Sequence, residues 1–278
     1  MRVEKTNRTN HVERRGVFGK RTPKSAVFRR AHQVKVARHL RPLAKTVFIT
    51  GTDTGVGKTM LAALLVAHLR TAGVHALAMK PFCSGSRRDA RILRAAQGGE
   101  LALNVLNPYY FEEAVAPMIA ARRAGQKISM EDVVEKIRRI RRRCDVLIIE
   151  GAGGILCPLG ERWTNLDLVK RLSCAVIVVA RNKLGVVNKV LLTLLRLTDT
   201  LAARTSIVLM DTSSPDMSTS TNSALLTEFY KTAHVTRVPF LTPEGAGSRQ
   251  IGGSKKKVKK VLRRQLSLLV SRCSLERL

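Results

Sequence analysis

A glycine-rich stretch with the order needed to hold the phosphates of a nucleotide spans residues 46–59. Its sequence, Thr-Val-Phe-Ile-Thr-Gly-Thr-Asp-Thr-Gly-Val-Gly-Lys-Thr, predicts a β-branched strand, a turn and the start of an apolar helix. Glycines let backbone N–H groups approach phosphate oxygens because no Cβ intervenes, and a helix N-terminus adds unpaired donors. Lys58 would then reach the outer phosphates, and the Thr59 hydroxyl would bind Mg²⁺.

The strict phosphate-loop pattern has a glycine five residues before Gly57, where this chain has Thr52 and places its glycine one residue earlier. A chance glycine-rich turn ahead of a helix is therefore the alternative interpretation. We favour the phosphate loop because the strand, the turn, the Lys-Thr pair and the helix follow one another in the required order.

Two further polar clusters follow apolar strand-like runs. Lys80 ends one run and opens the sequence Lys-Pro-Phe-Cys-Ser-Gly-Ser-Arg-Arg-Asp, and Glu150 ends another and opens Glu-Gly-Ala-Gly-Gly. Open parallel sheets bind ligands at the carboxyl ends of their strands, so Lys80 would meet an anion there and Glu150 could hold Mg²⁺ directly or through water. A lysine that only reaches solvent is the plain alternative. Residues 179–188 form a similar strand-to-helix turn, which either binds a carboxylate through its N–H groups or is an ordinary turn.

The elements that must position these residues alternate along the chain. From Lys45 onward, strand-like runs alternate with helical patterns, which predicts βαβ units and a mostly parallel sheet flanked by helices, an α/β fold of the P-loop NTPase type. Strands are expected at Thr46–Thr50, His75–Lys80, Asp145–Glu150, Ala175–Ala180, Ser206–Asp211 and Val235–Val238. Helices are expected at Lys58–Thr71, Asp89–Ala96, Met130–Cys144, Leu184–Ala203 and Ser218–Thr232.

Length and charge indicate one domain with basic ends. The chain has 278 residues and a net charge of +30. Residues 1–45 hold 14 Lys and Arg against 2 acidic residues, residues 251–278 hold 9 against 1, and the middle holds 27 against 17. The 5 cysteines include no Cys-x-x-Cys pair, which excludes a disulfide framework or a zinc site and indicates a reducing, cytoplasmic compartment. No apolar run is long enough to span a membrane, and the N-terminus has no secretory signal pattern.

The two tails have their own patterns. Residues 1–44 are rich in Arg, Lys, His, Thr and Asn, and we expect a disordered extension; a mitochondrial transit peptide and a mis-assigned start just before Lys45 are the alternatives. Residues 45–250 would form the nucleotide-binding domain. Residues 251–278 predict a basic amphipathic helix, which either packs on the domain, our preferred interpretation, or contacts an anionic surface.

Taken in order, these clusters resemble the dethiobiotin synthetase family of P-loop enzymes. The family shows Gly-Thr-Asp-Thr-x-Val-Gly-Lys-Thr, Lys-Pro-x-x-Ser-Gly, Asn-Pro-Tyr-x-Phe, Glu-Gly-Ala-Gly-Gly and Lys-Leu-Gly. Five ordered motifs make the resemblance specific, and it leaves out both tails. In this chain the motifs lie at Gly51–Thr59, Lys80–Gly85, Asn107–Phe111, Glu150–Gly154 and Lys183–Gly185.

The resemblance implies an ATP-dependent cyclo-ligase of biotin biosynthesis. ATP, CO₂ and 7,8-diaminononanoate would give dethiobiotin, ADP and phosphate, through a carbamate and a carbamic–phosphoric anhydride. By family match, Lys80 and Lys58 would be catalytic, and Thr59, Asp89 and Glu150 would hold Mg²⁺. The family's substrate contacts match Thr54, Ser84, Leu184, Gly185 and Asn188, the last three from the second subunit of a homodimer with the site at its interface. Its ATP contacts match Gly55, Val56, Gly57, Lys58, Thr59, Met60, Asp89, Glu150, Gly151, Ala152, Gly153, Asp211, Pro239, Phe240 and Glu244.

The chain departs from the family pattern at two places. Gly55 stands where the family often has Glu, so one polar contact would be missing. Met210 precedes Asp211 where the family often has Asn-Asp to recognise adenine. Methionine cannot make the paired hydrogen bonds of an amide. We therefore expect weaker selection of ATP over other nucleotides, or selection by the backbone near residues 238–240 and by Glu244.

Two other classes of protein share the loop. An enzyme of the cobyrinate-amidase type would continue into a glutaminase domain, for which too few residues follow the core here. A partition-type ATPase binds DNA through basic patches, which the charge of +30 would suit, but such proteins carry a second lysine early in the loop, where this chain has Thr52 and Asp53. We expect an enzyme with small-molecule substrates, without a membrane or nucleic-acid partner.

Overall fold

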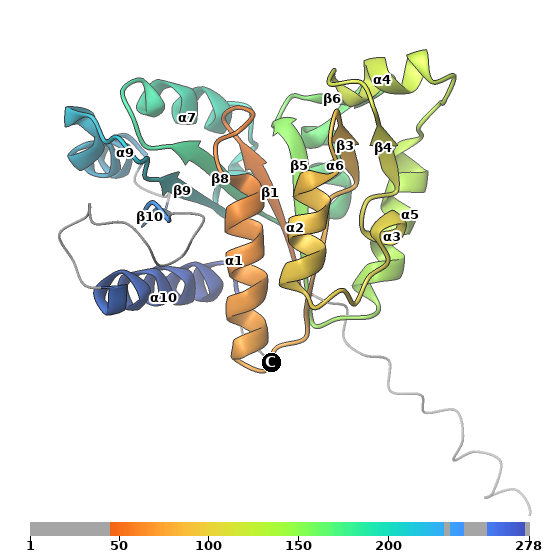
Figure 1. Ribbon diagram of the computed structural model, residues 1–278. Helices are drawn as coiled ribbons and strands as arrows, with labels where there is room; N and C mark the ends of the chain where they lie inside the picture. Colours follow the sequence, from red (N-terminus) through yellow and green to blue (C-terminus); the bar gives the residue numbers. More distant parts are fainter. Residues whose placement is uncertain (1–44, 231–233, 242–254, 276–278) are drawn as a thin grey trace, which may run out of the picture. The chain divides into compact units, whose positions relative to one another are not determined.

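The computed structural model describes residues 45–230, 234–241 and 255–275, which belong to one compact unit. The predicted extension at residues 1–44 and the predicted ATP contact Glu244 lie outside these ranges. Within them, the main sheet has six strands, all parallel, in the order β10-β9-β8-β1-β5-β2 (Figure 1). The parallel α/β fold predicted from the sequence is confirmed. The strands are β1 Lys45–Gly51, β2 Ala76–Met79, β5 Val146–Gly154, β8 Ala175–Arg181, β9 Thr205–Met210 and β10 His234–Val238.

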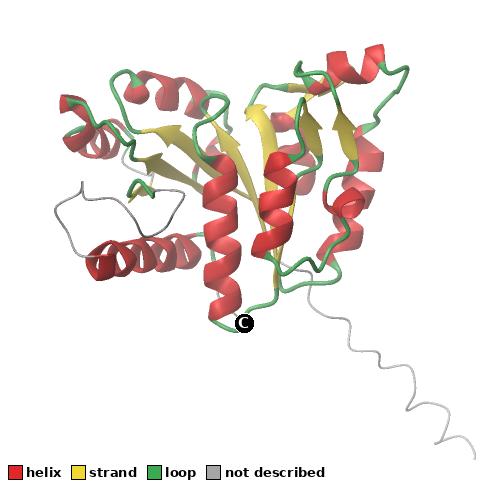
Figure 2. Ribbon diagram, viewed as in Figure 1, coloured by secondary structure: helices red, strands yellow, loops and turns green. Residues whose placement is uncertain are grey.

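Two small sheets and a set of helices complete the described part of the chain (Figure 2). Strand β3 (Phe82–Ser84) pairs in parallel with β4 (Tyr109–Phe111), and β6 (Pro158–Gly160) pairs antiparallel with β7 (Trp163–Thr164). The sequence analysis did not anticipate these short strands. The helices are α1 Lys58–Thr71, α2 Arg88–Ala96, α3 Leu103–Leu106, α4 Pro117–Arg123, α5 Met130–Arg141, α6 Asn165–Leu172, α7 Val186–Leu194, α8 Asp199–Ala202, the 3₁₀ helix η1 Met217–Ser220, α9 Asn222–Phe229 and α10 Lys255–Arg272.

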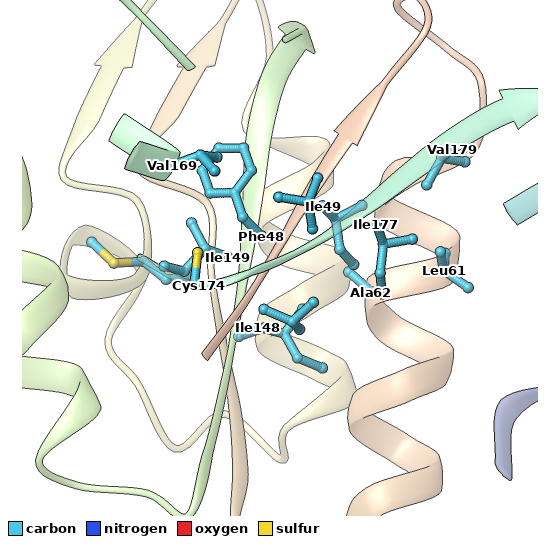
Figure 3. Packing of buried hydrophobic residues seen from close by; sticks show 14 of the residues in the cluster. Phe48, Ile49, Leu61, Ala62, Ile148, Ile149, Val169, Cys174, Ile177 and Val179 are labelled. Carbon is cyan, nitrogen blue, oxygen red and sulfur yellow. The ribbon is translucent and has the colours of Figure 1, made fainter. Parts of the chain in front are cut away.

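The core lies on both faces of the main sheet. Successive side chains of a strand point to opposite faces, so neighbouring residues of β1 enter different layers. Figure 3 shows Phe48 beside Val169 of α6, and Ile49 beside Ala62 of α1. All four residues are fully buried. Helices α1 and α6 therefore cover opposite faces of the sheet near the carboxyl end of β1.

Two helices that the sequence predicted as continuous are interrupted. The run 184–203 is divided into α7 and α8, because Thr198 takes an extended conformation (φ −68°, ψ 158°) and starts a new helix before an aspartate. The run 218–232 begins as η1, whose first turn is fixed by a 3.0 Å hydrogen bond from the Ser218 N–H to Asp216 Oδ1. The chain leaves the helical conformation at Thr198 in the first run, and Asp216 caps a 3₁₀ turn at the start of the second.

Helix α10 packs on the domain through its apolar side. Leu266, Leu269 and Val270 are buried, and the helix contacts α1 and β10. The Ser267 hydroxyl lies 3.3 Å from the His68 ring of α1. These contacts agree with the preferred interpretation of the basic tail. In the part of the chain that the structure describes, no helix is both long enough and apolar enough to cross a bilayer.

Strands β6 and β7 pack the single tryptophan of the chain against Gly160. The Trp163 indole N–H donates to Ile128 O at 3.4 Å, and the ring meets Phe82 edge-on with centroids 6.1 Å apart. A Cβ at position 160 would overlap the indole and lie 2.8 Å from Ile128 O. Close packing, rather than backbone conformation, therefore requires a glycine here.

We predict that Gly160→Ala lowers the free energy of unfolding by about 3 kcal/mol, the upper part of the usual range for overpacking a filled core. Gly73→Ala is the matched control, because Gly73 has φ +78° and no atom within 4 Å of an added Cβ. That variant carries only the conformational cost of about 1 kcal/mol. Urea denaturation followed by Trp163 fluorescence measures both. Wild-type stability of Gly160→Ala would contradict the packing argument.

Candidate active site

Three side chains from separate elements meet at the carboxyl edge of the sheet. The Lys80 ammonium lies 2.6 Å from Glu150 Oε1, and the Thr59 hydroxyl donates to the same oxygen at 2.7 Å. Lys80 is 5% exposed and Glu150 is 1% exposed. The strand register brings Lys80 and Glu150 together. Met79 pairs with Ile149 in the β2–β5 ladder, so the residues that follow them, Lys80 and Glu150, lie side by side.

Two carboxylates hold Lys80 as a cation. The second is Asp89, in the first turn of α2, whose Oδ2 lies 3.3 Å from the ammonium nitrogen. Burial alone would lower the pKa of Lys80, but the charges of Glu150 and Asp89 outweigh it and raise the pKa above its usual value. Lys80 is therefore a cation at neutral pH, paired with two carboxylates.

Lys58 supplies a second buried ammonium beside the first. It begins α1, is 7% exposed, and donates to Asp53 O at 2.8 Å. Burial is the main cause that lowers the pKa of Lys58, and the nearby Lys80 charge lowers it further. An anion placed near both ammonium groups would relieve this repulsion. The structure thus brings Lys58, Lys80 and Glu150 together.

Two oxygens at this site are buried without a hydrogen-bond partner among the described residues: Glu150 Oε2 and Ser84 Oγ. Mg²⁺ is usually held by one or two carboxylates, with waters and phosphate oxygens completing its octahedron. Thr59, Asp89 and Glu150 offer one hydroxyl and two carboxylates, and Oε2 still has free lone pairs, so this donor set fits Mg²⁺. Within the described ranges, no group of three or more His, Cys, Asp or Glu is arranged to hold a metal.

A cavity of about 370 Å³ adjoins the phosphate loop. Gly57, the residue before α1, adopts φ 106°, a conformation that glycine takes readily. A Cβ there would lie 3.0 Å from Met210 Cγ. The methionine therefore covers the loop with an apolar surface, at the position where the family pattern often has an asparagine that recognises adenine. The predicted ATP contacts that line this cavity are Gly55, Val56, Gly57, Met60, Asp211, Pro239 and Phe240.

Asp211 is already engaged by other side chains at the wall of this cavity. Arg237 of β10 lies 3.0 Å from its Oδ2, and the Asn182 amide donates to its Oδ1 at 2.7 Å. Asn182 is fully buried and accepts in turn from Asn222 at 2.9 Å. These partners were not predicted from the sequence. They belong to β10, to α9 and to the end of β8, which come together around Asp211 only through the strand order of the sheet.

A smaller cavity of about 80 Å³ contains two of the predicted substrate contacts, Thr54 and Leu184. The predicted contact Gly185 caps α7 with φ 84°, and the exposed Asn188 lies in the first turn of that helix. Ser84, the remaining predicted substrate contact, ends β3 outside this cavity. Thr54 and Leu184 of one chain therefore line the same small cavity.

Cations that the sequence analysis did not single out also line the smaller cavity. Arg181, at the end of β8, borders both cavities and donates to Gly55 O at 2.6 Å. Lys189 lies 3.2 Å from the Asp53 carboxylate. The Thr54 N–H and then Lys189 lower the pKa of Asp53. The phosphate loop is thus held from α7 and β8 as well as from its own strand.

The last four residues of β5, Gly151–Gly154, form an irregular stretch that we call the glycine turn, and it lies directly against the phosphate-loop strand. It follows Glu150, and Gly154 pairs with Gly51 at the end of β1. Gly153 has a positive φ of 61°. The predicted ATP contacts of this turn are therefore adjacent to the Lys80–Glu150–Thr59 cluster.

Comparison with known proteins gives one consistent family. Residues 45–246 match a family model described as an AAA domain. The ATP-dependent dethiobiotin synthetase BioD of Anaeromyxobacter sp. (strain Fw109-5) is 46% identical over 151 residues, which cover 53% of this chain and 68% of that protein. The synthetase of the same name from Akkermansia muciniphila is 37% identical over 150 residues, with 54% and 70% covered.

Solved structures support the fold at much lower identity. The MinC:MinD cell division protein complex of Aquifex aeolicus has a TM-score of 0.51 at 14% identity, covering 84% of this chain and 98% of that one. A structure of pNOB8 ParA bound to nonspecific DNA has a TM-score of 0.50 at 13% identity, with 84% and 100% covered. These likenesses show the fold alone. The sequence matches, joined to the five ordered motifs, show that the chain belongs to the ATP-dependent dethiobiotin synthetase family.

Proposed function

We propose that this chain carboxylates 7,8-diaminononanoate with CO₂ and closes the ring of dethiobiotin, converting ATP to ADP and phosphate. The observation that carries the proposal is the convergence of buried Lys80 with Glu150 and Thr59, next to Lys58 of the phosphate loop. The reaction brings two anions together, a carbamate and the terminal phosphate of ATP. Two buried ammonium groups would offset the repulsion between them.

The proposed reaction proceeds through three changes of bonding. One amine of the substrate attacks CO₂, forms a C–N bond and releases a proton, which gives a carbamate. A carbamate oxygen then attacks the γ-phosphorus of ATP, and the P–O bond to ADP breaks. The second amine attacks the carbonyl carbon of this mixed anhydride, loses a proton and expels phosphate as the five-membered urea ring closes.

The residues of the chain have separate tasks in this scheme. Lys58, at the N-terminus of α1, would neutralise the outer phosphates of ATP. Lys80, with its raised pKa, would remain a cation while negative charge builds on the transferred phosphoryl group. Ser84, whose buried hydroxyl has no partner in the described part of the chain, would hydrogen-bond the substrate together with Thr54.

Thr59, Asp89 and Glu150 would hold Mg²⁺, which neutralises phosphate charge when it is bound. The chain itself keeps these oxygens together, because Thr59 bonds Glu150 and Lys80 lies between Glu150 and Asp89. Lys80 and the hydroxyl share Glu150 Oε1, which leaves Oε2 as the oxygen open to a further ligand.

We predict that Lys58→Ala and Lys80→Ala each reduce incorporation of labelled bicarbonate into dethiobiotin by about 100-fold or more, the usual loss when one transition-state charge contact is removed. Stability should separate the two variants. Lys80→Ala leaves the buried Glu150 unpaired and should cost about 3–5 kcal/mol, whereas Lys58 gives up only a backbone carbonyl partner.

The control for this pair is Lys170→Ala, which removes an exposed lysine near the end of α6. It should keep wild-type turnover and stability. Near-normal product formation by folded Lys80→Ala would contradict the assigned role of Lys80. Absence of labelled product from the wild type, with ATP, Mg²⁺ and diaminononanoate supplied, would contradict the proposed function itself.

We predict weak discrimination between nucleotides, because Met210 covers the phosphate loop and Asp211 is engaged by Arg237 and Asn182. Values of kcat/KM for ATP, GTP and CTP should lie within about tenfold of one another, a difference of about 1.4 kcal/mol in transition-state stabilisation. Met210→Asn should raise the preference for ATP by restoring an amide. A strong preference for ATP in the wild type would be the contrary result.

The exposed apolar surface of α7, η1 and α9 supports a homodimer. Leu192 and Leu195 are 56% and 77% exposed, Met217 is 96% exposed and Phe229 is 68% exposed. Helix α7 contacts α9, and α9 contacts η1, so these side chains belong to neighbouring elements. Exposed large apolar side chains gathered on neighbouring elements are typical of an interaction site, and we propose that a second copy of the chain covers them near Leu184 and the substrate site.

We predict that the double variant Leu192→Lys/Leu195→Lys sediments as a monomer at concentrations where the wild type is a dimer, since charge at the centre of an apolar interface is not compensated. Turnover should fall with the loss of the dimer. Leu268→Lys is the control, because Leu268 is a 43% exposed leucine on α10. A double variant that remains dimeric, or a wild type that is monomeric, would rule out this interface.

A further inference from the structure

We propose that Asn165 is a positioning residue that fixes the glycine turn, Gly151–Gly154, so that the N–H of Gly153 is directed away from Asn165 and toward the end of β1. The proposal rests on the proposed function for its catalytic consequence, since the turn adjoins Glu150. Asn165 lies outside every sequence motif discussed above. It is the first residue of α6 and is fully buried.

The amide of Asn165 bridges two carbonyl groups of the turn. Its Nδ2 donates to Ala152 O at 2.6 Å and to Gly154 O at 2.7 Å. Both acceptors are carbonyl oxygens, so only the amide nitrogen can face them. In a trans peptide the C=O and the following N–H point in opposite directions. Fixing these two carbonyls toward Asn165 therefore fixes the N–H of Gly153 and the N–H of Ile155 on the other side.

The other side of this segment is the end of β1, because Gly154 pairs with Gly51 where β1 runs into the phosphate loop. Lys58 begins α1. A Gly153 N–H that points toward this end of β1 lies beside the start of the phosphate loop, where a backbone N–H can bind a phosphate or carbamate oxygen.

Helix α6 is itself held in place, so Asn165 provides a rigid anchor. A capping box joins Thr164 and Asp167 at its start, with the Thr164 N–H donating to Asp167 Oδ2 at 2.8 Å. The Leu166 N–H donates to Ile155 O at 2.9 Å, which ties the chain just after the turn to the same helix end. The turn and the residue after it are thus attached to α6 at three carbonyls, those of residues 152, 154 and 155.

Gly151 is confined between Asn165 and the core. An added Cβ would lie 2.8 Å from the Phe48 ring and 3.0 Å from Asn165 Oδ1. That oxygen is buried and accepts no hydrogen bond from the described residues. Asn165 therefore contacts the turn with both ends of its amide, and it leaves one acceptor unpaired to do so. A purely stabilising residue would not need this arrangement, because an unpaired buried acceptor costs free energy.

Asn165→Asp tests the proposal, because it keeps the shape of the side chain and places an oxygen where the donor was. We expect kcat to fall by about 100-fold, the scale of loss when reacting groups are misplaced by about 1 Å, while the KM values for ATP and diaminononanoate change by less than about threefold. Amide hydrogen exchange in a peptide covering residues 151–157 should accelerate about tenfold, with exchange across α1 unchanged.

Gln97→Glu is the matched control, since Gln97 is also fully buried and its amide also bonds a backbone carbonyl, that of Ala78 at 3.3 Å. It should lose similar stability without changing kcat or exchange at residues 151–157. If Asn165→Asp does not fold, Asn165→Ser removes the bridge without burying a charge and should give the same loss of kcat.

The proposal is overturned if Asn165→Asp or Asn165→Ser folds and keeps wild-type kcat and wild-type hydrogen exchange at residues 151–157. It is also overturned if Gln97→Glu loses as much kcat as the Asn165 variants do. Hydrogen exchange reports on the turn even without catalysis. A wild type that makes no dethiobiotin while Asn165→Asp still loosens the turn would therefore refute the proposed function and leave the positioning role intact.

Discussion

The buried ion pair between Lys80 and Glu150 is the interaction on which the rest of the site depends. Moving two charges out of water costs several kcal/mol per ion, about as much as their mutual attraction returns, so such a pair contributes little net stability. This one persists because each charge has a second partner: Asp89 at 3.3 Å from Lys80 and Thr59 at 2.7 Å from Glu150. A cluster of this kind provides a preorganised charge, which is what phosphoryl transfer needs from a protein.

The meeting of these residues could be predicted from the sequence because strand ends are recognisable there. Apolar runs end at Lys80 and at Glu150, and parallel strands bring their carboxyl ends to one edge. The contact itself could not be predicted, since it requires β5 to insert between β1 and β2 and Met79 to pair with Ile149. Strand order and register arise from packing over the whole sheet, and no local pattern specifies them.

Other parts of the site were missed for physical reasons that differ. Asn165 and Arg237 act through partners 13 and 26 residues away in the sequence, and an isolated polar residue in a helix start or an edge strand has no recognisable spacing. The short strands β3, β4, β6 and β7 have two or three residues each, too few to show a period. Thr198 was placed within a longer helical pattern, although threonine favours helix caps, and the cap at Asp216 lies just before the predicted helix 218–232.

The two ends of the nucleotide site are built from different interactions. The phosphate end depends on buried charge from α1, from the end of β2 and from β5, with the glycine turn held by Asn165. The end toward the larger cavity has an apolar methionine and an aspartate already paired with Arg237, on β9 and β10. Charge interactions in a buried site are sensitive to small displacements, whereas apolar contact with a planar base tolerates several shapes. Changes in β9 and β10 can therefore alter the contacts with the base, while the register between β2 and β5, which brings Lys80 beside Glu150, stays the same.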